Sequence, residues 1–368
     1  MSSDVFEIRG NDDFQQLKPE WNDLLSRSPC NVPFLRHEWI SQWSECFSHE
    51  NERTTIIASD GGKLLFGLPL IETSIGRGPI ALRVLQSSTN SHSFRFHYLA
   101  DQSRSDVLQD VLQYLHGRRN WHMLQLSYVP LGDYSLNQFL RSAEEMGFTA
   151  CVKPMFDTAV LLISGSWEDH QAGLKKSFKK TMRRQDKRMK ELGDVCVETL
   201  EDRNDVLAAL PEAFDIERRS WKGESGSAIA CQPNLVQFYT ALAESTSQLG
   251  WMRLSFLKIG DARTAFEFAF EYDRRFFSIK IGFDSEQYGA LSVGRRLVHE
   301  SVGRCFQQGL QEYDFVGAYS SAQEYWQPMT RPVGWVYIYN QKVLSKLHHL
   351  GEFRVKPLIK NVIRPKRD

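Results

Sequence analysis

The sequence predicts a protein of the α/β class, in its α+β form, that contains two similar units. Each unit is expected to have a mixed, mostly antiparallel sheet flanked by helices. Two observations predict this fold: paired apolar segments precede an amphipathic helix and a buried strand, and this order occurs in both halves of the chain. A length of 368 residues leaves room for two or three domains.

The first unit is predicted from three segments. Residues 54–73 contain two apolar runs around an Asp-Gly-Gly turn, which is typical of a hairpin. Residues 105–120 place apolar side chains at helical spacing, and residues 121–130 are apolar enough for a buried strand. The predicted order is strand, strand, helix, strand.

The second unit shows a similar order near the C-terminus. Residues 253–284 contain three segments in which aromatic and β-branched residues alternate, separated by turns at 260–261 and 273–275. An amphipathic helix is predicted over 293–310, and residues 313–320 complete the unit as a strand. The two halves look like copies of one plan.

The segment between the halves, residues 166–193, is predicted to be one long surface helix. Ser166 and Asp169 form a capping box at its start, and Gly193 ends it. The expected inward stripe is Leu174, Phe178, Met182, Met189 and Leu192. The other faces carry the cations Lys175, Lys176, Lys179, Lys180, Arg183, Arg184, Lys187, Arg188 and Lys190. A solvated basic face explains this pattern, and so does a site for an anionic ligand, a nucleic acid such as tRNA or a membrane surface.

These segments divide the chain into three predicted parts. They are an N-terminal unit at 1–165, the basic connecting helix at 166–193 and a C-terminal unit at 194–368.

Composition excludes several classes of protein. Hydrophobic residues make up 42% and charged residues 24%, which is the balance of a globular protein. The 45 basic residues equal the 45 acidic ones in number, so the net charge does not attract a charged partner, and such a partner would have to bind a local charged patch. The six cysteines lie far apart without a CxxC pair, so no metal and no disulfide framework are expected. Because the sequence shows neither a signal peptide nor an apolar run of about 18 residues, we expect a cytoplasmic protein, with a membrane-peripheral role left open.

One corner of the second unit is suited to a phosphate. Residues 285–301 lead from a strand through a loop with Gly and Ser into a helix, whose first turn exposes unpaired amides and a partial positive charge. Ser292 is expected to cap this helix, Gly294 lets the backbone approach a ligand, and Arg295 and Arg296 add two cations. Because the motif is short, an ordinary capped turn is the alternative.

The chain resembles the GNAT-superfamily acyltransferases of the CelD type, which are related to the FemA/FemB-like transferases. Five stretches carry the likeness: PFLRHEWISQWSECF at 33–47, LKKSFKKTMRRQDKRMKELGDV at 174–195, ARTAFEFAFEYDRRFFSIKIGFDSEQY at 262–288, LSVGRRL at 291–297 and GLQEYDFVGA at 309–318. Two features differ from the family. Val293 stands where the family has Pro, and no lysine follows Gly317 in SSAQEYWQP, which puts catalytic competence in question.

The resemblance implies tandem GNAT-like domains and an acyl-CoA co-substrate, either acetyl-CoA or a longer acyl-CoA. Its pantetheine arm is expected along a strand edge from Phe268 to Glu271, with Phe268 and Phe270 among the binding residues. Its pyrophosphate is expected at Ser292, Gly294, Arg295 and Arg296.

Acyl transfer needs a base for the nucleophile and a proton donor for the departing thiolate. Glu267 and Glu271 share one face of a predicted strand and are candidate bases, with a salt bridge to Arg253 or Arg274 as the alternative. Tyr319 and Tyr325 are candidate proton donors, and packing of their rings is the alternative.

Three functions follow from the resemblance. The first is an N- or O-acyltransferase, such as an acetyltransferase, that acylates an amine or hydroxyl of a small precursor in envelope polysaccharide biosynthesis. The second is a FemA/FemB-like transferase that takes its aminoacyl group from tRNA and engages the RNA through the basic helix at 175–190. The third is a degenerate GNAT pair that serves as a binding or scaffold protein.

Overall fold

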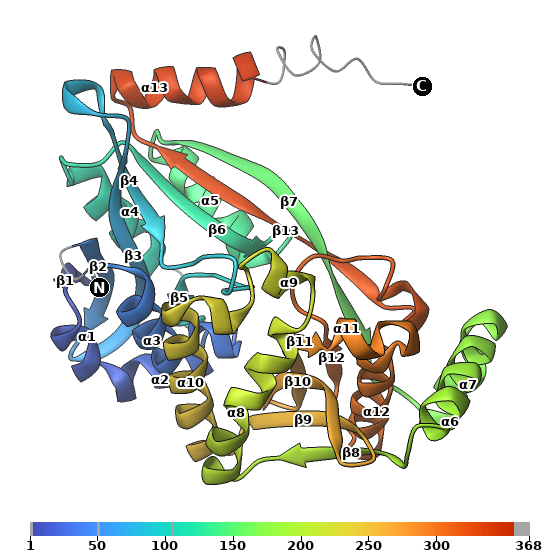
Figure 1. Ribbon diagram of the computed structural model, residues 1–368. Helices are drawn as coiled ribbons and strands as arrows, with labels where there is room; N and C mark the ends of the chain where they lie inside the picture. Colours follow the sequence, from blue (N-terminus) through green and yellow to red (C-terminus); the bar gives the residue numbers. More distant parts are fainter. Residues whose placement is uncertain (1–2, 50–51, 105, 357–368) are drawn as a thin grey trace. The chain divides into compact units, whose positions relative to one another are not determined.

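The computed structural model describes residues 3–49, 52–104 and 106–356 (Figure 1). The chain divides into two compact units: unit 2 comprises Phe156–Arg331, and unit 1 comprises Met1–Met155 with the segment from Pro332 on. This division differs from the predicted limits at 165 and 193. The reason is that both unit boundaries fall inside strands, β7 (Thr149–Leu162) and β13 (Met329–Tyr339), where the sequence has no turn or linker.

Unit 1 contains four successive antiparallel strands and then a parallel one. The strands are β1 (Asp4–Arg9), β2 (Arg53–Asp60), β3 (Lys63–Ile75), β4 (Leu82–Ser87) and β6 (Met123–Pro130), and β4 pairs with β6 in parallel. The short β5 (Leu99–Ala100) pairs with β3, and β13 pairs antiparallel with β6. The hairpin predicted at 54–73 is confirmed as β2 and β3, joined by Gly61 and Gly62 at φ 56° and 83°.

The connection between the parallel strands β4 and β6 contains the predicted helix, α4 (Val107–Gly117). Its helically spaced residues Val107, Val111, Leu112 and Leu115 are all buried. The remaining α-helices of unit 1 are α1 (Asp12–Gln16), α2 (Lys18–Ser26), α3 (His37–Phe47), α5 (Tyr134–Glu145) and α13 (Val343–Leu350).

Unit 2 has the same order of strands and crossover helix. The strands are β8 (Val195–Leu200), β9 (Met252–Ile259), β10 (Ala262–Tyr272), β11 (Arg275–Phe283) and β12 (Glu312–Asp314). The first four pair antiparallel, β11 pairs with β12 in parallel, and α12 (Val293–Gln307) forms the crossover. The predicted repeat of a mixed, mostly antiparallel sheet with helices is therefore confirmed in both units.

Helices cover both faces of the unit 2 sheet. Phe268 of β10 packs edge-on against Tyr239 of α10 (Pro233–Gln248), whereas the neighbouring Glu267 accepts a hydrogen bond from Ser301 of α12. Since successive strand residues point to opposite faces, α10 and α12 lie on opposite sides of the sheet. Two further helices, α8 (Arg203–Arg218) and α9 (Trp221–Glu224), precede α10 in the chain.

The basic segment forms two helices, so the prediction of one long helix is wrong. α6 (Trp167–Gly173) ends at Leu174, whose ψ of 146° is extended, and α7 (Lys176–Lys190) follows. The predicted capping at Ser166 is confirmed, because its side chain accepts from the Asp169 amide at 3.0 Å. Of the predicted stripe, Leu174, Phe178, Met182 and Met189 are buried, but Leu192 is 62% exposed because it lies beyond the last turn of α7.

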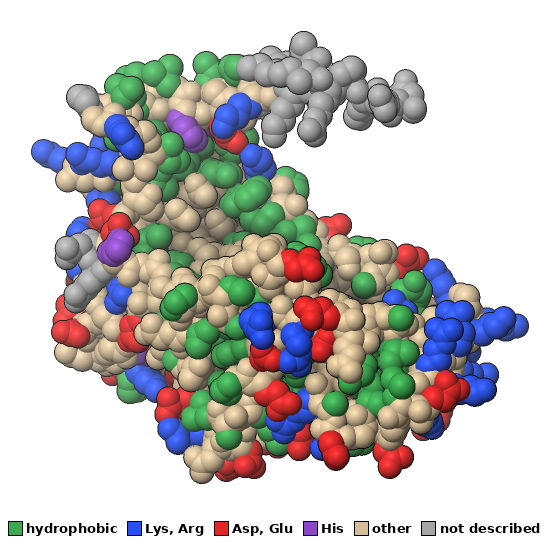
Figure 2. All heavy atoms as spheres, viewed as in Figure 1, with side chains coloured by type: hydrophobic (Ala, Val, Ile, Leu, Met, Phe, Trp, Pro, Cys, Tyr) green, Lys and Arg blue, Asp and Glu red, His purple; other side chains and the backbone are tan. Residues whose placement is uncertain are grey.

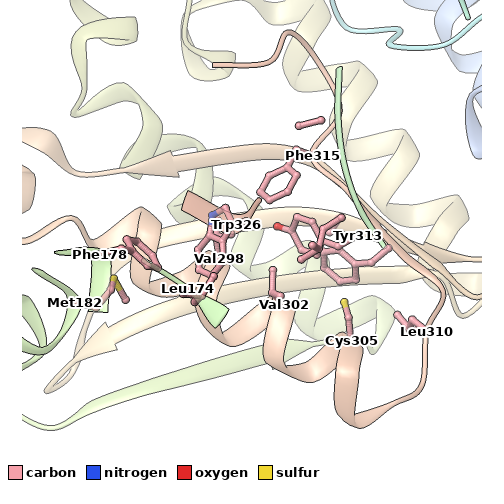
Figure 3. Close-up of a cluster of buried hydrophobic side chains, with 14 residues drawn as sticks. Leu174, Phe178, Met182, Val298, Val302, Cys305, Leu310, Tyr313, Phe315 and Trp326 are labelled. Atoms are coloured by element: carbon pink, nitrogen blue, oxygen red, sulfur yellow. The ribbon is translucent and has the colours of Figure 1, made fainter. Parts of the chain in front are cut away.

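A shared apolar cluster joins the basic segment to α12. In Figure 3, Phe178 and Met182 of α7 and Leu174 before it meet Val298 and Val302 of α12 together with Trp326. This cluster holds α7 beside the N-terminal half of α12, where the candidate site lies.

Candidate functional site: the start of α12

The chain enters α12 through an unusual backbone corner. β11 is followed by α11 (Ser285–Tyr288), a 3-10 turn at Gly289–Leu291 and Ser292, whose φ of 55° and ψ of 40° are left-handed. The predicted capping role of Ser292 is wrong, because its side chain makes no cap hydrogen bond and instead accepts from Gln185 Nε2 at 2.7 Å. The first amides of α12 are therefore left uncapped by the residue at the N-cap.

A cavity of about 330 Å³ opens at this corner. Three of the four predicted phosphate-binding residues line it, Ser292, Gly294 and Arg295, together with Gly289. The rest of the lining is mainly apolar: Ile281, Phe283, Val298, Phe315, Ala322, Gln323 and Trp326. At Gly294 a Cβ atom would lie 3.2 Å from the Phe283 ring, so glycine keeps this wall of the cavity open.

The cavity follows a free edge of β11. The pairing of β11 with β12 ends at Phe277 and Asp314, and after Phe315 the chain turns away through Val316 and Gly317 at φ 53° and 62°. Beyond that point, among the described residues, no strand pairs with β11 on this side. The edge therefore offers backbone donors and acceptors next to the cavity.

This geometry corrects the predicted strand edge at Phe268 to Glu271. β10 is an inner strand: Phe268 pairs with Leu254 on one side and Lys280 on the other, and Phe270 is paired on both sides as well. Phe268 and Phe270 are buried and do not line the cavity. The sequence pointed to β10, whereas the free edge belongs to β11, the other strand of the hairpin. That edge is free because β12 is too short to pair with the rest of β11.

The two predicted cations have different surroundings. Arg295 lines the cavity and stacks over the ring of Tyr325 at 4.9 Å, without an acidic partner among the described residues. Arg296 forms ion pairs with Asp186, at 2.9 Å, and with Glu300. Its charge is therefore compensated within the protein, and Arg295 is the cation that faces the cavity.

The candidate base Glu267 is fully buried. Neither predicted arginine partner reaches it; the hydroxyls of Ser278, Ser301 and Tyr313 donate to its carboxylate instead. Burial raises the pKa of Glu267, and these three hydrogen bonds oppose that rise. Because Glu267 does not line the cavity, its role as a base stays a prediction.

The other three candidates lie outside the cavity lining as well. Glu271 forms the salt bridge weighed as its alternative, with Arg253 Nη2 at 3.1 Å. Tyr325 packs its ring between Phe178 and Arg295. Tyr319 is 38% exposed. The roles of Tyr319 and Tyr325 as proton donors stay predictions.

Sequence reasoning missed a buried ion pair on the opposite face of β11. Glu217 at the end of α8 is fully buried between Lys222 Nζ at 2.7 Å and Lys280 Nζ at 3.6 Å. The signal was a single lysine inside the apolar strand SIKIGF.

Neither a metal centre nor a membrane-spanning helix is found within residues 3–49, 52–104 and 106–356. In these ranges no group of three or more His, Cys, Asp or Glu side chains is placed to hold a metal ion. No helix in them has the length and apolarity needed to cross a bilayer.

Residues 176–326 match a family model described as an acetyltransferase (GNAT) domain, which includes the corner and its cavity. No curated protein matches the sequence. The match confirms the predicted GNAT fold and supports an acyltransferase.

The fold is also similar to solved structures. FemX aligns with a TM-score of 0.62 and 10% identity, over 94% of this chain and 99% of that one. L-PGS from Bacillus licheniformis aligns with a TM-score of 0.51 and 11% identity, over 98% of this chain and 99% of that one. The C-terminal domain (DUF2156) of a putative lysylphosphatidylglycerol synthetase from Agrobacterium fabrum aligns with a TM-score of 0.52 and 10% identity, over 92% of this chain and 97% of that one. At these identities the likeness concerns the fold alone.

Proposed function

We propose that the protein is an acyltransferase that takes an acyl group from an acyl-CoA-type thioester and transfers it to an amine or a hydroxyl. The observation that carries this proposal is the continuous cavity that begins at the uncapped start of α12 and follows the free edge of β11. A diphosphate fits the first part, where helix amides and Arg295 supply positive charge. An extended, mostly apolar arm fits the second part, against Ile281 and Phe315.

The free edge of β11 also suits the chemistry. When the acceptor's lone pair attacks the thioester carbonyl, negative charge develops on the carbonyl oxygen. A fixed backbone N–H at the free edge is the kind of donor that stabilises such an oxyanion without reorganisation. The bond from carbon to sulfur then breaks, and the acceptor's proton balances the departing thiolate. The choice of a polysaccharide precursor as acceptor rests on the CelD-type resemblance alone.

Calorimetry with acetyl-CoA tests the donor site. We expect Arg295→Ala to weaken acetyl-CoA binding about 10-fold or more, because a charge-assisted contact to a phosphate is lost. Arg304→Ala is the matched control: it lies on the same helix, pairs with Glu201 and is absent from the cavity lining. Absence of binding by the parent protein, or equal losses in the two variants, would contradict the donor site. Binding without turnover on a broad panel of amines and sugars would favour the scaffold function.

A second candidate function, transfer from aminoacyl-tRNA, is favoured by the surface of α7. Figure 2 shows Lys and Arg side chains gathered where Figure 1 draws α7. Lys175 pairs with Glu324, and Lys179 donates to the Ala172 carbonyl. Seven other exposed cations have no acidic partner among the described residues: Lys176, Lys180, Arg183, Arg184, Lys187, Arg188 and Lys190.

Filter binding of charged tRNA over a salt series separates the two candidates. If the α7 surface contacts RNA phosphates, log affinity falls linearly with log salt, and an Arg183→Glu/Arg184→Glu variant shows a shallower slope. Affinity that stays flat with salt would exclude the tRNA-dependent function.

A further inference from the structure

A β-bulge gives Lys280 its orientation. Across the β10–β11 pair, Phe268 faces Lys280 but Ala269 faces Ser278, so Ile279 is an extra residue on β11. Ser278 points to the α12 face, where it donates to Glu267. In a regular strand, Lys280 would point to that face too, because it is two residues further on. The bulge reverses the alternation, and Lys280 lies instead beside Glu217 of α8 on the opposite face.

The charges around Lys280 do not balance. One carboxylate, Glu217, is shared by two ammonium groups and also accepts the Ile229 amide at 2.9 Å. Lys222 holds the close position at 2.7 Å, whereas Lys280 Nζ, at 3.6 Å, is beyond hydrogen-bond distance. The Lys280 side chain is only 15% exposed, and its burial lowers the pKa of the ammonium group, an effect that Glu217 partly offsets. A partly desolvated cation with incomplete compensation is costly, unless an anion completes it.

The position of this cation relates it to the transfer site. Lys280 lies on the free stretch of β11, three residues past the last pair with β12, and its neighbour Ile281 lines the donor cavity. A thioester held on the α12 face leaves the opposite face of the free edge as the side for the second reactant. On that face β11 presents Lys280, next to α8 and the ring of Tyr239 on α10.

Resting on the proposed function, we propose that Lys280, together with Lys222, binds an anionic group of the acceptor, a carboxylate or a phosphate, on the face of β11 opposite the acyl donor. The acceptor is then an amine or hydroxyl compound that also carries such a group. Glu217 holds the two ammonium groups in place and limits their net charge to one positive unit, which the acceptor's anion neutralises.

An NMR titration tests this directly, without an acyl donor. In protein labelled with ¹³Cε-lysine, the Lys280 signal is the one missing from Lys280→Arg. We expect it to shift saturably when inorganic phosphate or acetate replaces chloride at constant ionic strength, and the anion that gives the tighter curve identifies the group. Lys258 on β9, away from Glu217, serves as the internal reference.

Variants and the donor separate this proposal from its alternatives. Lys222→Met should lower the affinity for the anion about 10-fold, because one charged partner of the bound anion is lost. Arg295→Ala should leave the Lys280 curve unchanged, and acetyl-CoA should not displace the anion, because the two sites lie on opposite faces of β11. If acetyl-CoA fails to bind while Lys280 still responds, the donor proposal fails alone. A Lys280 signal that moves no more than Lys258, or an anion that acetyl-CoA displaces, would overturn the inference.

Discussion

The starts of α12 in unit 2 and α4 in unit 1 occupy the same place in the repeated plan but differ in chemistry. Each helix forms the crossover between two parallel strands, and each start borders a cavity, of about 330 Å³ at α12 and about 300 Å³ at α4. The second residue of α12 is Gly294, whereas the second residue of α4 is Leu108, which lines its cavity. The two corners therefore share a backbone plan and differ in the room left beside the helix.

The charges at the two corners differ in sign. α4 has Asp106 at its N-cap and Asp110 in its first turn, whereas Arg295 and Arg296 occupy the first turn of α12. At the α4 corner Arg104 is bound by Asp60 at 2.8 Å and by Asp106 at 2.9 Å. The fold supplies a helix start in both units. Among the described residues, the cation that lines the α4 cavity, Arg104, is paired with carboxylates, whereas Arg295 at the α12 cavity is not.

The largest expected effect comes from making α12 resemble α4. Gly294→Leu places a side chain against Phe283, 3.2 Å from the Cβ position, and fills the corner. We expect acetyl-CoA affinity to fall by at least ~100-fold in calorimetry, because the diphosphate loses both its space and the close approach to the helix amides. Gly117→Ala, at a glycine with open space around it, is the control. Unchanged affinity in Gly294→Leu would place the donor elsewhere.

The buried acids of the two units should respond to pH in opposite directions. Burial alone would raise the pKa of Asp101, but hydrogen bonds from Ser103 and Lys63 and the charge of Arg27 lower that pKa to about 2. The ionised Asp101 therefore stabilises the folded state at pH values above 3.8, its ordinary pKa, and this stabilisation is lost as the pH falls toward 2. For Glu267 the pKa is raised, so its contribution is present at low pH and is lost as the pH rises above 4.5.

Urea unfolding between pH 2 and pH 7 measures this difference. We expect Asp101→Asn to cost about 2 kcal/mol at pH 7 and almost nothing near pH 2, since one pKa unit corresponds to ~1.4 kcal/mol. The free energy of unfolding of Glu267→Gln, relative to that of the parent, should increase as the pH rises from 4 to 7. Parallel curves for the two variants would contradict the opposite pKa shifts of the two acids.

The smallest effect is expected from the reverse exchange. Leu108→Gly opens space at the α4 corner, but Asp106 and Asp110 keep that helix start acidic. We therefore expect Leu108→Gly to restore nothing: a Leu108→Gly/Gly294→Leu double variant should bind acetyl-CoA no better than Gly294→Leu alone. Tighter binding by the double variant would mean that room alone, without a favourable charge, makes a donor site.

The sequence predicts the fold and the corner well because both depend on local patterns. Two apolar runs around an Asp-Gly-Gly turn identified the hairpin at 54–73, and the loop before Val293 located the helix start, where Ser292, Gly294 and Arg295 line a cavity. What it could not predict depends on pairing between distant segments. The free edge belongs to β11 because β12 has only three paired residues, and this shortness cannot be read from GLQEYDFVGA.

Side-chain partners were also beyond the sequence. Arg296 is neutralised by Asp186 of α7, and Ser292 is engaged by Gln185 of the same helix, although more than a hundred positions separate them in the chain. The role of Lys280 could not be predicted, because the alternation of side chains along the strand does not reveal its partner. The bulge at Ile279 turns Lys280 toward Glu217, and no glycine or proline marks that bulge in the sequence.

Hydrogen exchange with and without acetyl-CoA tests the central claim most directly. We expect slower exchange in peptides covering the free edge of β11 and the first turn of α12, with no change at the first turn of α4. Exchange that slows at α4, or that does not change at α12 while acetyl-CoA is bound, would contradict it.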